Sequence, residues 1–275
     1  MITIERFKNT KNLIFSMAID QQLMEEIELK LEVITKNPEY AGRLHKALHN
    51  GLMDIGNVHS FWLEYPELRH NLLVNGNHVG SERRARKLGI QGIRRIKDAW
   101  YFIRTHKQGN LLSNLDQESI KKVAQLIEPE KNANGYRTEE VTLNIPGYRP
   151  PKPCQIPALM EVFLREIKEG DLHPVERAAG VHLTLTGIQP FLDGNKRTAR
   201  LLQDGLLFDY LIPPAIIPTG ERDIYVTLLS RALLNPANIL DQRPFCDYIG
   251  GKVNAVFRPQ GSRQHLLHFF FPIIY

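Results

Sequence analysis

Apolar residues recur at helical spacing along most of this 275-residue chain, and this period constrains the fold more than any other feature of the sequence. One stripe consists of Ile19, Leu23, Ile27, Leu31 and Ile34. A second consists of Met160, Phe163, Leu164 and Ile167. The second stripe starts after Pro157 and runs into Gly170, which are the start and stop signals of a short helix. The period therefore predicts an all-α fold.

Two further helices are predicted in the second half of the chain. One begins near Pro174 and places five residues on its inner face: Val175, Ala178, His182, Leu185 and Ile188. The other runs from Asn195 to about Leu211 and has apolar residues on more than one side. A helix that is apolar on several sides is typical of the centre of a fold.

One stretch departs from the helical period. Val141-Thr142-Leu143-Asn144-Ile145 alternates like a strand and is followed by Pro146-Gly147, so we predict a small β-hairpin flap at about residues 141–151. No internal repeat or low-complexity linker divides the chain. We therefore divide it near residue 90, into an N-terminal helical region, 1–90, and a core, 91–275.

Composition favours a soluble, cytoplasmic protein. With 43% apolar and 24% charged residues the chain can bury a substantial core. Its two cysteines, Cys154 and Cys246, lie far apart without metal-ligand spacing, which argues against a disulfide framework or a zinc site. Charged residues appear at Glu5 and Arg6, too early in the chain for the apolar part of a secretory signal. The apolar tail 269–275 is far shorter than the roughly 20 residues that span a bilayer. We expect that tail to pack on its own domain or to form a homodimer contact.

Positive charge is concentrated in two short runs, 83–87 and 94–97, in a chain of formal charge +5 and pI near 9.1. Such a charge fits a nucleotide, a nucleic acid or an acidic protein partner. No helix-turn-helix, RNP-type aromatic pattern or zinc finger accompanies the runs, so we interpret them as solvated helix faces and rank nucleic-acid binding last.

The residues that carry chemistry lie in the segment 188–200, Ile188-Gln189-Pro190-Phe191-Leu192-Asp193-Gly194-Asn195-Lys196-Arg197-Thr198-Ala199-Arg200. Because Gly194 has no side chain, a ligand can come close to the backbone at this position. The free amides and the dipole of the following helix favour an anion there. Arg197 and Arg200 lie about one turn apart and can both reach a polyphosphate. Asp193 can hold a magnesium ion between phosphate oxygens. The same residue types also fit an ordinary loop with surface arginines.

This segment resembles the signature of the Fic (Fido) family, His-x-Phe-x-Asp/Glu-Gly-Asn-Gly/Lys-Arg-x-x-Arg. The resemblance extends over roughly residues 70–250 through flanking matches at 135–137, 148–151, 173–174 and 221–225. It implies a Fic-type helical bundle with a flap, and transfer of AMP from ATP to a hydroxyl of a target protein.

Matched residue by residue, the resemblance assigns a role to each position of the segment. Phe191 would anchor the loop, Asp193 would hold Mg²⁺, and the flap at 145–148 would clamp the target segment. Gly194, Asn195 and Lys196 would line the phosphate cradle, and Arg197 and Arg200 would grip the outer phosphates. Lysine at 196 also occurs in the Doc-like kinase branch, so it does not choose between AMP transfer and phosphate transfer.

The main departure from the signature is Gln189, which stands where the family has its general-base histidine. An amide has no lone pair basic enough to accept a proton near neutral pH. Loss of a general base typically costs ~10²- to 10⁴-fold in rate, so transfer is predicted to be reduced or lost while nucleotide binding persists. His182 is the nearest alternative base in sequence, but its place on an inner helical face predicts a hydrogen-bonded core histidine.

Two other departures concern the regulation and the nucleotide side of the site. Residues 71–77 resemble the family's inhibitory Ser/Thr-x-x-x-Glu-Gly/Asn helix with Asn75 in place of the glutamate, although they also fit an unrelated turn. In the family that glutamate pairs with the arginine matched by Arg200, and an amide cannot form this ion pair. Asp204 stands where the family often has asparagine near the nucleotide.

Two hypotheses follow from these matches and departures. The first is a Fic-type nucleotidyl or phosphoryl transferase that uses Mg-ATP slowly. The second is a binding protein, a degenerate Fic domain that keeps a nucleotide pocket and acts as a regulatory subunit. The apparent loss of both the base and the inhibitory acid favours the second, whereas retention of Asp193, Gly194, Asn195, Arg197 and Arg200 favours function at the site.

Overall fold

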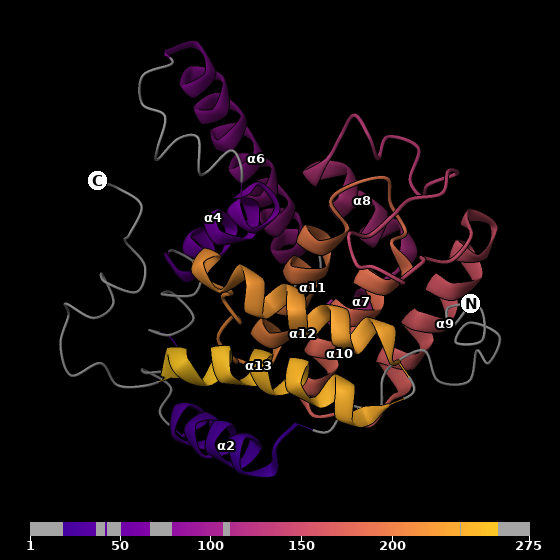
Figure 1. The fold of residues 1–275 in the computed structure, drawn as a ribbon. Helices are drawn as coiled ribbons and strands as arrows, with labels where there is room; N and C mark the ends of the chain where they lie inside the picture. Colours follow the sequence, from indigo (N-terminus) through magenta and orange to yellow (C-terminus); the bar gives the residue numbers. More distant parts are fainter. Residues whose placement is uncertain are drawn as a thin grey trace.

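The computed structural model describes residues 19–36, 42, 51–66, 79–106, 111–236 and 238–257. The all-α prediction is confirmed, because the described residues form helices joined by loops and contain no strand (Figure 1). The helices are α2 (Gln21–Thr35), α4 (Met53–Glu64), α6 (Val79–His106), α7 (Leu111–Asn114), α8 (Gln117–Ile127), α9 (Ile156–Glu169), α10 (Pro174–Ile188), α11 (Asn195–Asp209), α12 (Arg222–Leu234) and α13 (Ile239–Phe257), with 3₁₀ turns η2 (Pro153–Gln155) and η3 (Thr219–Glu221).

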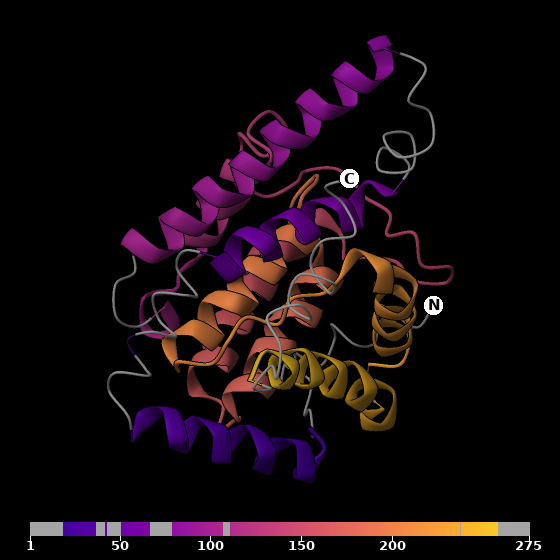
Figure 2. The same cartoon turned by 90° about the vertical axis from the view of Figure 1, so that its left-hand side faces the viewer.

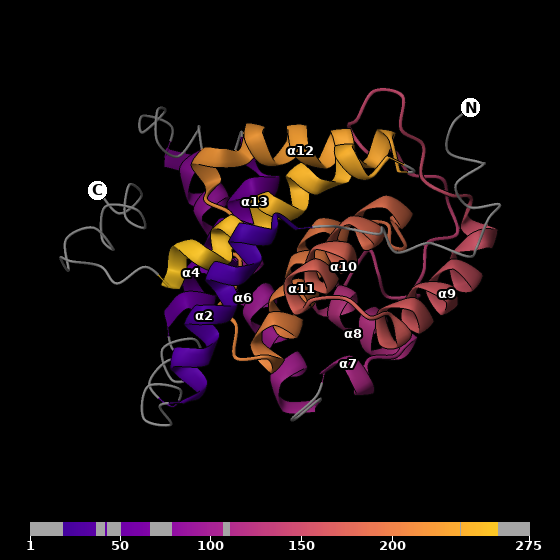
Figure 3. The ribbon, with the colours of Figure 1, turned by 90° about the horizontal axis from the view of Figure 1, so that it is seen from below.

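Helices α10 and α11 form the centre of the molecule. They pack against each other, with α12 and α13 on one side and α7, α8 and α9 on the other (Figure 3). Nearly every residue of both helices is buried. This explains why the sequence of α11 is apolar on more than one side.

Two hydrophobic clusters lie on either side of this central pair. The first joins α4, α6, α8 and α9 to α10 and α11 around side chains such as Phe163 and Trp100. The second joins α2, α12 and α13 to the opposite face of α10 around Tyr225 and Phe245. The segments that flank the α10–α11 turn are therefore held on both sides, which makes that turn a rigid place for a binding site.

Several predicted helix boundaries are confirmed. Helix α9 ends at Glu169 before Gly170, and α10 begins at Pro174. The imidazole of His173 accepts a hydrogen bond from the amide of Val175 and so caps α10. Residue 90 lies inside α6, and the division of the chain at that point stays a prediction.

Helix α4 lies against the long helix α6 and beside the central pair (Figure 2). A Cβ at Gly92 of α6 would lie 2.0 Å from the Phe61 ring, so glycine permits this close approach. This packing places the C-terminal end of α4 near the start of α11.

The predicted β-hairpin was wrong in its local structure, because residues 141–151 form no strand. Their backbone instead makes a turn in which the amide of Tyr148 donates to the carbonyl of Ile145 at 3.1 Å. Ile145 is buried and Leu143 packs against the second hydrophobic cluster. The alternation of apolar residues thus reflects packing on the helical body, not pairing with another strand.

None of the described helices is both long enough and apolar enough to cross a membrane. The apolar tail 269–275, for which a packing or dimer role was predicted, lies outside the described residues.

Candidate functional site

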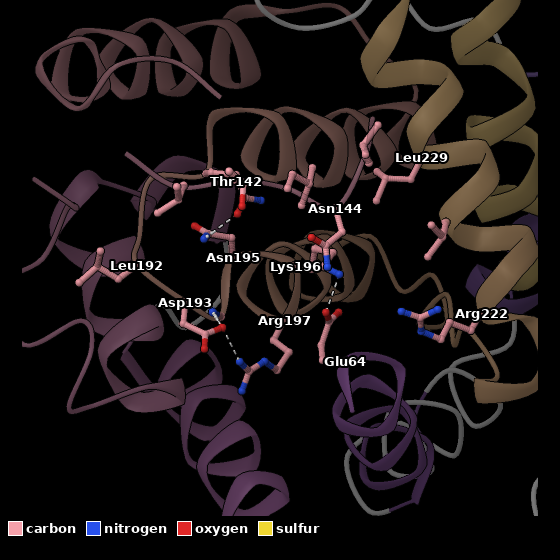
Figure 4. A pocket seen from close by; sticks show the side chains of 16 residues that line it. Glu64, Thr142, Asn144, Leu192, Asp193, Asn195, Lys196, Arg197, Arg222 and Leu229 are labelled. Carbon is pink, nitrogen blue, oxygen red and sulfur yellow. Dashed lines mark hydrogen bonds and ion pairs between the residues drawn. The ribbon is translucent and has the colours of Figure 1, made fainter. Parts of the chain in front are cut away.

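A pocket of about 280 Å³ lies at the N-terminus of α11 (Figure 4). It is lined by the 189–197 segment, by 141–145, and by Arg222, Val226 and Leu229 of the α12 region. Glu64, the last residue of α4, also lines it. The fold thus brings together most of the residues predicted for the site, except Arg200.

Asn195 closes the loop that precedes α11. Its side-chain oxygen accepts from the amide of Phe191 at 2.9 Å, and its nitrogen donates to the carbonyl of Phe191 at 2.8 Å. The ring of Phe191 is fully buried beside Tyr136, as expected for an anchor. The Asn195 side chain is therefore part of the loop's internal structure.

Gln189 ends α10 in the left-handed conformation, with φ of 50°. Its Nε2 donates to the carbonyl of Thr186 at 2.7 Å, and its Oε1 accepts from Nδ2 of Asn195 at 3.0 Å. Its backbone carbonyl accepts from Nε of Arg137 at 2.6 Å. Gln189, predicted to stand at the position of the family's base, thus joins the end of α10 to the start of α11.

Gly194 is the N-cap of α11, with φ of 77°. A Cβ at this position would lie 3.1 Å from Cγ2 of Ile127 and 3.3 Å from Cγ of Glu128, so both the conformation and the space require glycine. No side chain caps the helix, and its first-turn residues line the pocket. First-turn amides lack helical acceptors and favour an anion.

Two cations hold the carboxylate of Asp193. Nη2 of Arg197 lies 3.0 Å from Oδ1, and Nζ of Lys131 lies 2.5 Å from Oδ2. Arg197 is 2% exposed and also pairs with Glu128 at 2.6 Å. Burial by itself would raise the pKa of Asp193, but the hydrogen bond from Lys131 and the charge of Arg197 outweigh burial and lower it. Arg197 therefore braces the loop, and Lys131 is a site residue that the sequence analysis missed.

The residues present fit a magnesium ion only in part. Among the described residues no three His, Cys, Asp or Glu side chains come together to hold a metal. Mg²⁺ often binds through one or two carboxylates plus substrate phosphates, and Asp193 fits such a role. A metal ion at Oδ2 would first have to displace the ammonium group of Lys131, whose side chain is 57% exposed.

Glu64 is held by two cations that were predicted to bind phosphates, Lys196 of the cradle and Arg200. Its Oε2 lies 2.5 Å from Nζ of Lys196, and its Oε1 lies 2.8 Å from Nη2 of Arg200. Burial by itself would raise the pKa of Glu64, but the charges of Lys196 and Arg200 outweigh burial and hold it at about 2. Glu64 lines the pocket whereas Arg200 does not, so the carboxylate separates Arg200 from the pocket.

The acid partner of Arg200 corrects one expectation from the sequence. Residues 71–77, where Asn75 was matched to the inhibitory glutamate, lie outside the described residues. Arg200 nevertheless has an acid partner, in Ser60-x-x-x-Glu64, and its Nε donates to Oγ of Ser60 at 2.9 Å. This spacing matches the Ser/Thr-x-x-x-Glu pattern, with Tyr65 in place of Gly or Asn, and was the signal that could have located it.

Arg137 and Tyr148 fasten the 138–151 segment beside the pocket. The Arg137 guanidinium donates to the carbonyls of Gln189, Glu139 and Pro151 at 2.6, 2.7 and 2.5 Å. The Tyr148 hydroxyl donates to the carbonyl of Gly187 at 2.7 Å. Both ends of the segment are thus tied to the α10–α11 turn.

His182 is fully buried in the core and does not line the pocket. Burial lowers its pKa to about 3, with the charge of Arg200 acting in the same direction. The prediction that it is a hydrogen-bonded core histidine agrees with its contacts to Gln203 and Tyr225.

Residues 114–207 match the model of the Fic/DOC family, and this range contains the loop, Gln189 and both arginines. Residues 114–207 are a Fic/DOC domain. The chain is similar to proteins named protein adenylyltransferase Fic, with 37% identity over 126 residues to that of Drosophila grimshawi and 42% over 106 residues to that of Drosophila persimilis. The matched regions are 45% and 38% of this chain but only 24% and 20% of those two relatives.

Solved Fic structures share the fold of the whole helical body around this Fic/DOC domain. A Fic domain-containing signalling protein from Bacteroides thetaiotaomicron superposes with a TM-score of 0.65 at 21% identity, covering 86% of this chain and 94% of that protein. Fic-1 (residues 134–508) from C. elegans gives a TM-score of 0.57 at 19% identity, covering 93% of this chain and 71% of that one. At these identities the likeness concerns the fold alone.

Proposed function

We propose that the pocket binds the phosphates of ATP and that the domain transfers AMP from ATP to a target hydroxyl slowly. The observation that carries this proposal is the carboxylate of Glu64, which lies between Lys196 and Arg200. The carboxylate is an anion held by two cations beside a helix N-terminus, as a phosphate group would be. Glu64 therefore acts as a stand-in for the outer phosphate.

Glu64 also makes the site self-inhibited in the form seen here. A phosphate can reach Arg200 only after Glu64 withdraws, because Glu64 lies between Arg200 and the pocket. The rest of α4 has its own attachments, since Nε of Arg222 donates to the carbonyl of Leu63 at 3.0 Å. Withdrawal of the Glu64 side chain therefore does not require release of the whole helix.

The donor is proposed to be ATP because the similar Drosophila proteins are named adenylyltransferases. Lys196, Arg200 and the first-turn amides of α11 would hold its phosphates. Asp193 would hold Mg²⁺ together with phosphate oxygens, and that ion would neutralise charge on them. The target segment would lie along the pocket edge formed by 141–145, which Arg137 and Tyr148 keep in place.

The slow rate follows from the lack of a suitable proton acceptor. The amide of Gln189 is not basic, and its two polar atoms already bind Thr186 and Asn195. The two acids that line the pocket, Glu64 and Asp193, both have lowered pKa values and are weak bases for that reason. Once Glu64 withdraws, the site would therefore bind and orient phosphates but remove a hydroxyl proton poorly.

A second candidate is a regulatory subunit that binds ATP without turnover. Both polar atoms of the Gln189 side-chain amide are hydrogen-bonded, so the residue has a structural role at this position, which favours the regulatory subunit. A third is a Doc-like phosphotransferase, which Lys196 permits.

The experiment compares the unmodified chain, Glu64→Ala, Gln189→His and the double variant, with ATP labelled at the α- or γ-phosphate. We expect ATP binding by Glu64→Ala and α-label transfer chiefly by the double variant, faster by ~10²-fold or more than by Glu64→Ala alone. Transfer of γ-label would identify the phosphotransferase. If ATP binds but none of the four proteins transfers label, the regulatory subunit is supported. If none of the four binds ATP, the proposed site is contradicted. Glu130→Ala, which removes an exposed acid outside the pocket, is the control for the loss of Glu64.

A further inference from the structure

A buried chain of hydrogen bonds leads from Arg200 to residues that do not line the pocket. Nη1 of Arg200 donates to the hydroxyl of Tyr225 at 3.2 Å. That hydroxyl lies 2.9 Å from Nε2 of His182, and Nδ1 of His182 lies 2.8 Å from Oε1 of Gln203. Gln203 in turn donates to Oδ1 of Asp204 at 3.1 Å. The chain links α11 to α10 and α12 and returns to α11 one turn after Arg200.

The direction of every hydrogen bond in this relay can be assigned. Gln203 uses its nitrogen on Asp204, so its oxygen accepts and His182 must carry its proton on Nδ1. Nε2 of His182 is then an acceptor, and the Tyr225 hydroxyl must donate to it. The Tyr225 oxygen is left as acceptor for Arg200. All donors therefore point from Arg200 towards Asp204, an arrangement in which each bond polarises the next.

The relay is rigid because its members are buried and packed. His182, Gln203 and Tyr225 are 0, 0 and 1% exposed. The imidazole also packs edge-on against Phe245 at 5.2 Å between ring centroids. Its orientation is therefore determined by the core rather than by the contents of the pocket.

We propose that Tyr225 and His182 are positioning residues for Arg200, holding Nη1 so that Nη2 is directed at the pocket-lining carboxylate of Glu64. Ser60 holds the guanidinium as well, because its Oγ accepts from Nε and its backbone carbonyl accepts from Nη2. The relay does not involve Glu64, so it stays intact when Glu64 withdraws. Nε then stays on Ser60, and the guanidinium presents the Nη2 donor that Glu64 has released to the outer phosphate of a nucleoside triphosphate. This inference rests on the proposed function, in which Arg200 receives that phosphate.

The affinity test uses Tyr225→Phe in the Glu64→Ala background, where the pocket is open. We expect ATP to bind about 10-fold more weakly than to Glu64→Ala, the loss typical of a hydrogen bond to a charged group, while ADP affinity changes little. Tyr248→Phe is the matched control, because its hydroxyl donates to Glu221 and is not part of the relay. Equal ATP and ADP losses, or no loss, would overturn the positioning role.

Two spectroscopic tests need no nucleotide, and the first of them needs no variant. ¹⁵N NMR of the unmodified chain should show His182 as the neutral Nδ1–H tautomer, and the Nε2–H tautomer would overturn the proposal. In ¹⁵N-arginine spectra of the nucleotide-free chain, Tyr225→Phe should broaden or shift the Arg200 Nη1 signal, identified by its absence in Arg200→Lys. An unchanged signal would also overturn it. If Glu64→Ala binds no nucleotide, the proposed function fails, and these spectra alone decide whether the relay positions Arg200.

Discussion

The carboxylate of Glu64 lies 2.8 Å from the guanidinium of Arg200, although 136 residues separate them in the chain. The same carboxylate binds Lys196, so one acid from α4 neutralises two cations at the start of α11. In the proposed function, the site opens when a phosphate replaces Glu64 at this place.

Glu64→Ala is expected to raise affinity for ATP by about 10-fold or more, since it removes the competing anion. It should also lower the stability of the nucleotide-free protein by about 3 kcal/mol, because Lys196 and Arg200 lose their shared partner. Calorimetric ATP titration and urea denaturation measure the two effects. Glu130→Ala, which removes an exposed partner of Arg95, is the control and should change neither. An unchanged ATP affinity in Glu64→Ala would contradict the stand-in role.

Lys131→Met is expected to make ATP binding more dependent on Mg²⁺. In the unmodified chain Nζ of Lys131 binds the oxygen of Asp193 that a metal would need. Its removal frees that oxygen, so the ratio of ATP affinities with Mg²⁺ and with EDTA should rise by about 10-fold. The measurement is best made in Glu64→Ala. Lys122→Met is the matched control, because Nζ of Lys122 contacts Gln125 outside the pocket. The same ratio in both lysine variants would show that Lys131 does not compete with the metal.

Arg137→Met is expected to destabilise the protein by about 3–5 kcal/mol, because three backbone carbonyls lose a charged donor in a buried place. Cleavage of the 138–151 segment in limited proteolysis should accelerate as well. Arg149→Met, in the exposed part of the same segment, should change stability by less than about 0.5 kcal/mol. Similar proteolysis of the two variants would rule out Arg137 as the attachment of the segment.

The stability of the protein should depend on pH through Asp204. Burial raises the pKa of Asp204 from 3.8 to about 6 in the folded protein. A raised folded-state pKa means that the contribution of Asp204 is fully present below about pH 4 and is lost as pH rises through 6. The loss is on the order of 2–3 kcal/mol. Asp204→Asn should therefore gain stability relative to the unmodified chain between pH 4 and 7 in urea denaturation. A difference that is constant over this range would contradict the raised pKa.

Much of the local structure could be predicted from neighbouring residues. Pro174 and Gly170 mark helix ends because proline suits a first turn and a glycine stops a helix, and both signals act within a few residues. The loop before α11 was located for the same reason, since Gly194 supplies the φ of 77° that the turn needs. The strand predicted at 141–145 is absent, because an alternating pattern shows which side chains are buried but does not show whether the backbone pairs with another strand.

The sequence by itself determined the helical class and the loop between α10 and α11, and it matched Gln189 to the position of the family's base, because periodicity, turn chemistry and motif spacing are local properties. Only the tertiary structure decided that Arg200 meets Glu64, that Asp193 meets Lys131, and that Tyr225 and His182 lie behind Arg200. These partners come from different helices, and the choice depends on how α4, α10 and α12 pack around α11. A stripe of apolar residues predicts which face of a helix is buried, but it does not specify which charged side chain the neighbouring helix places opposite.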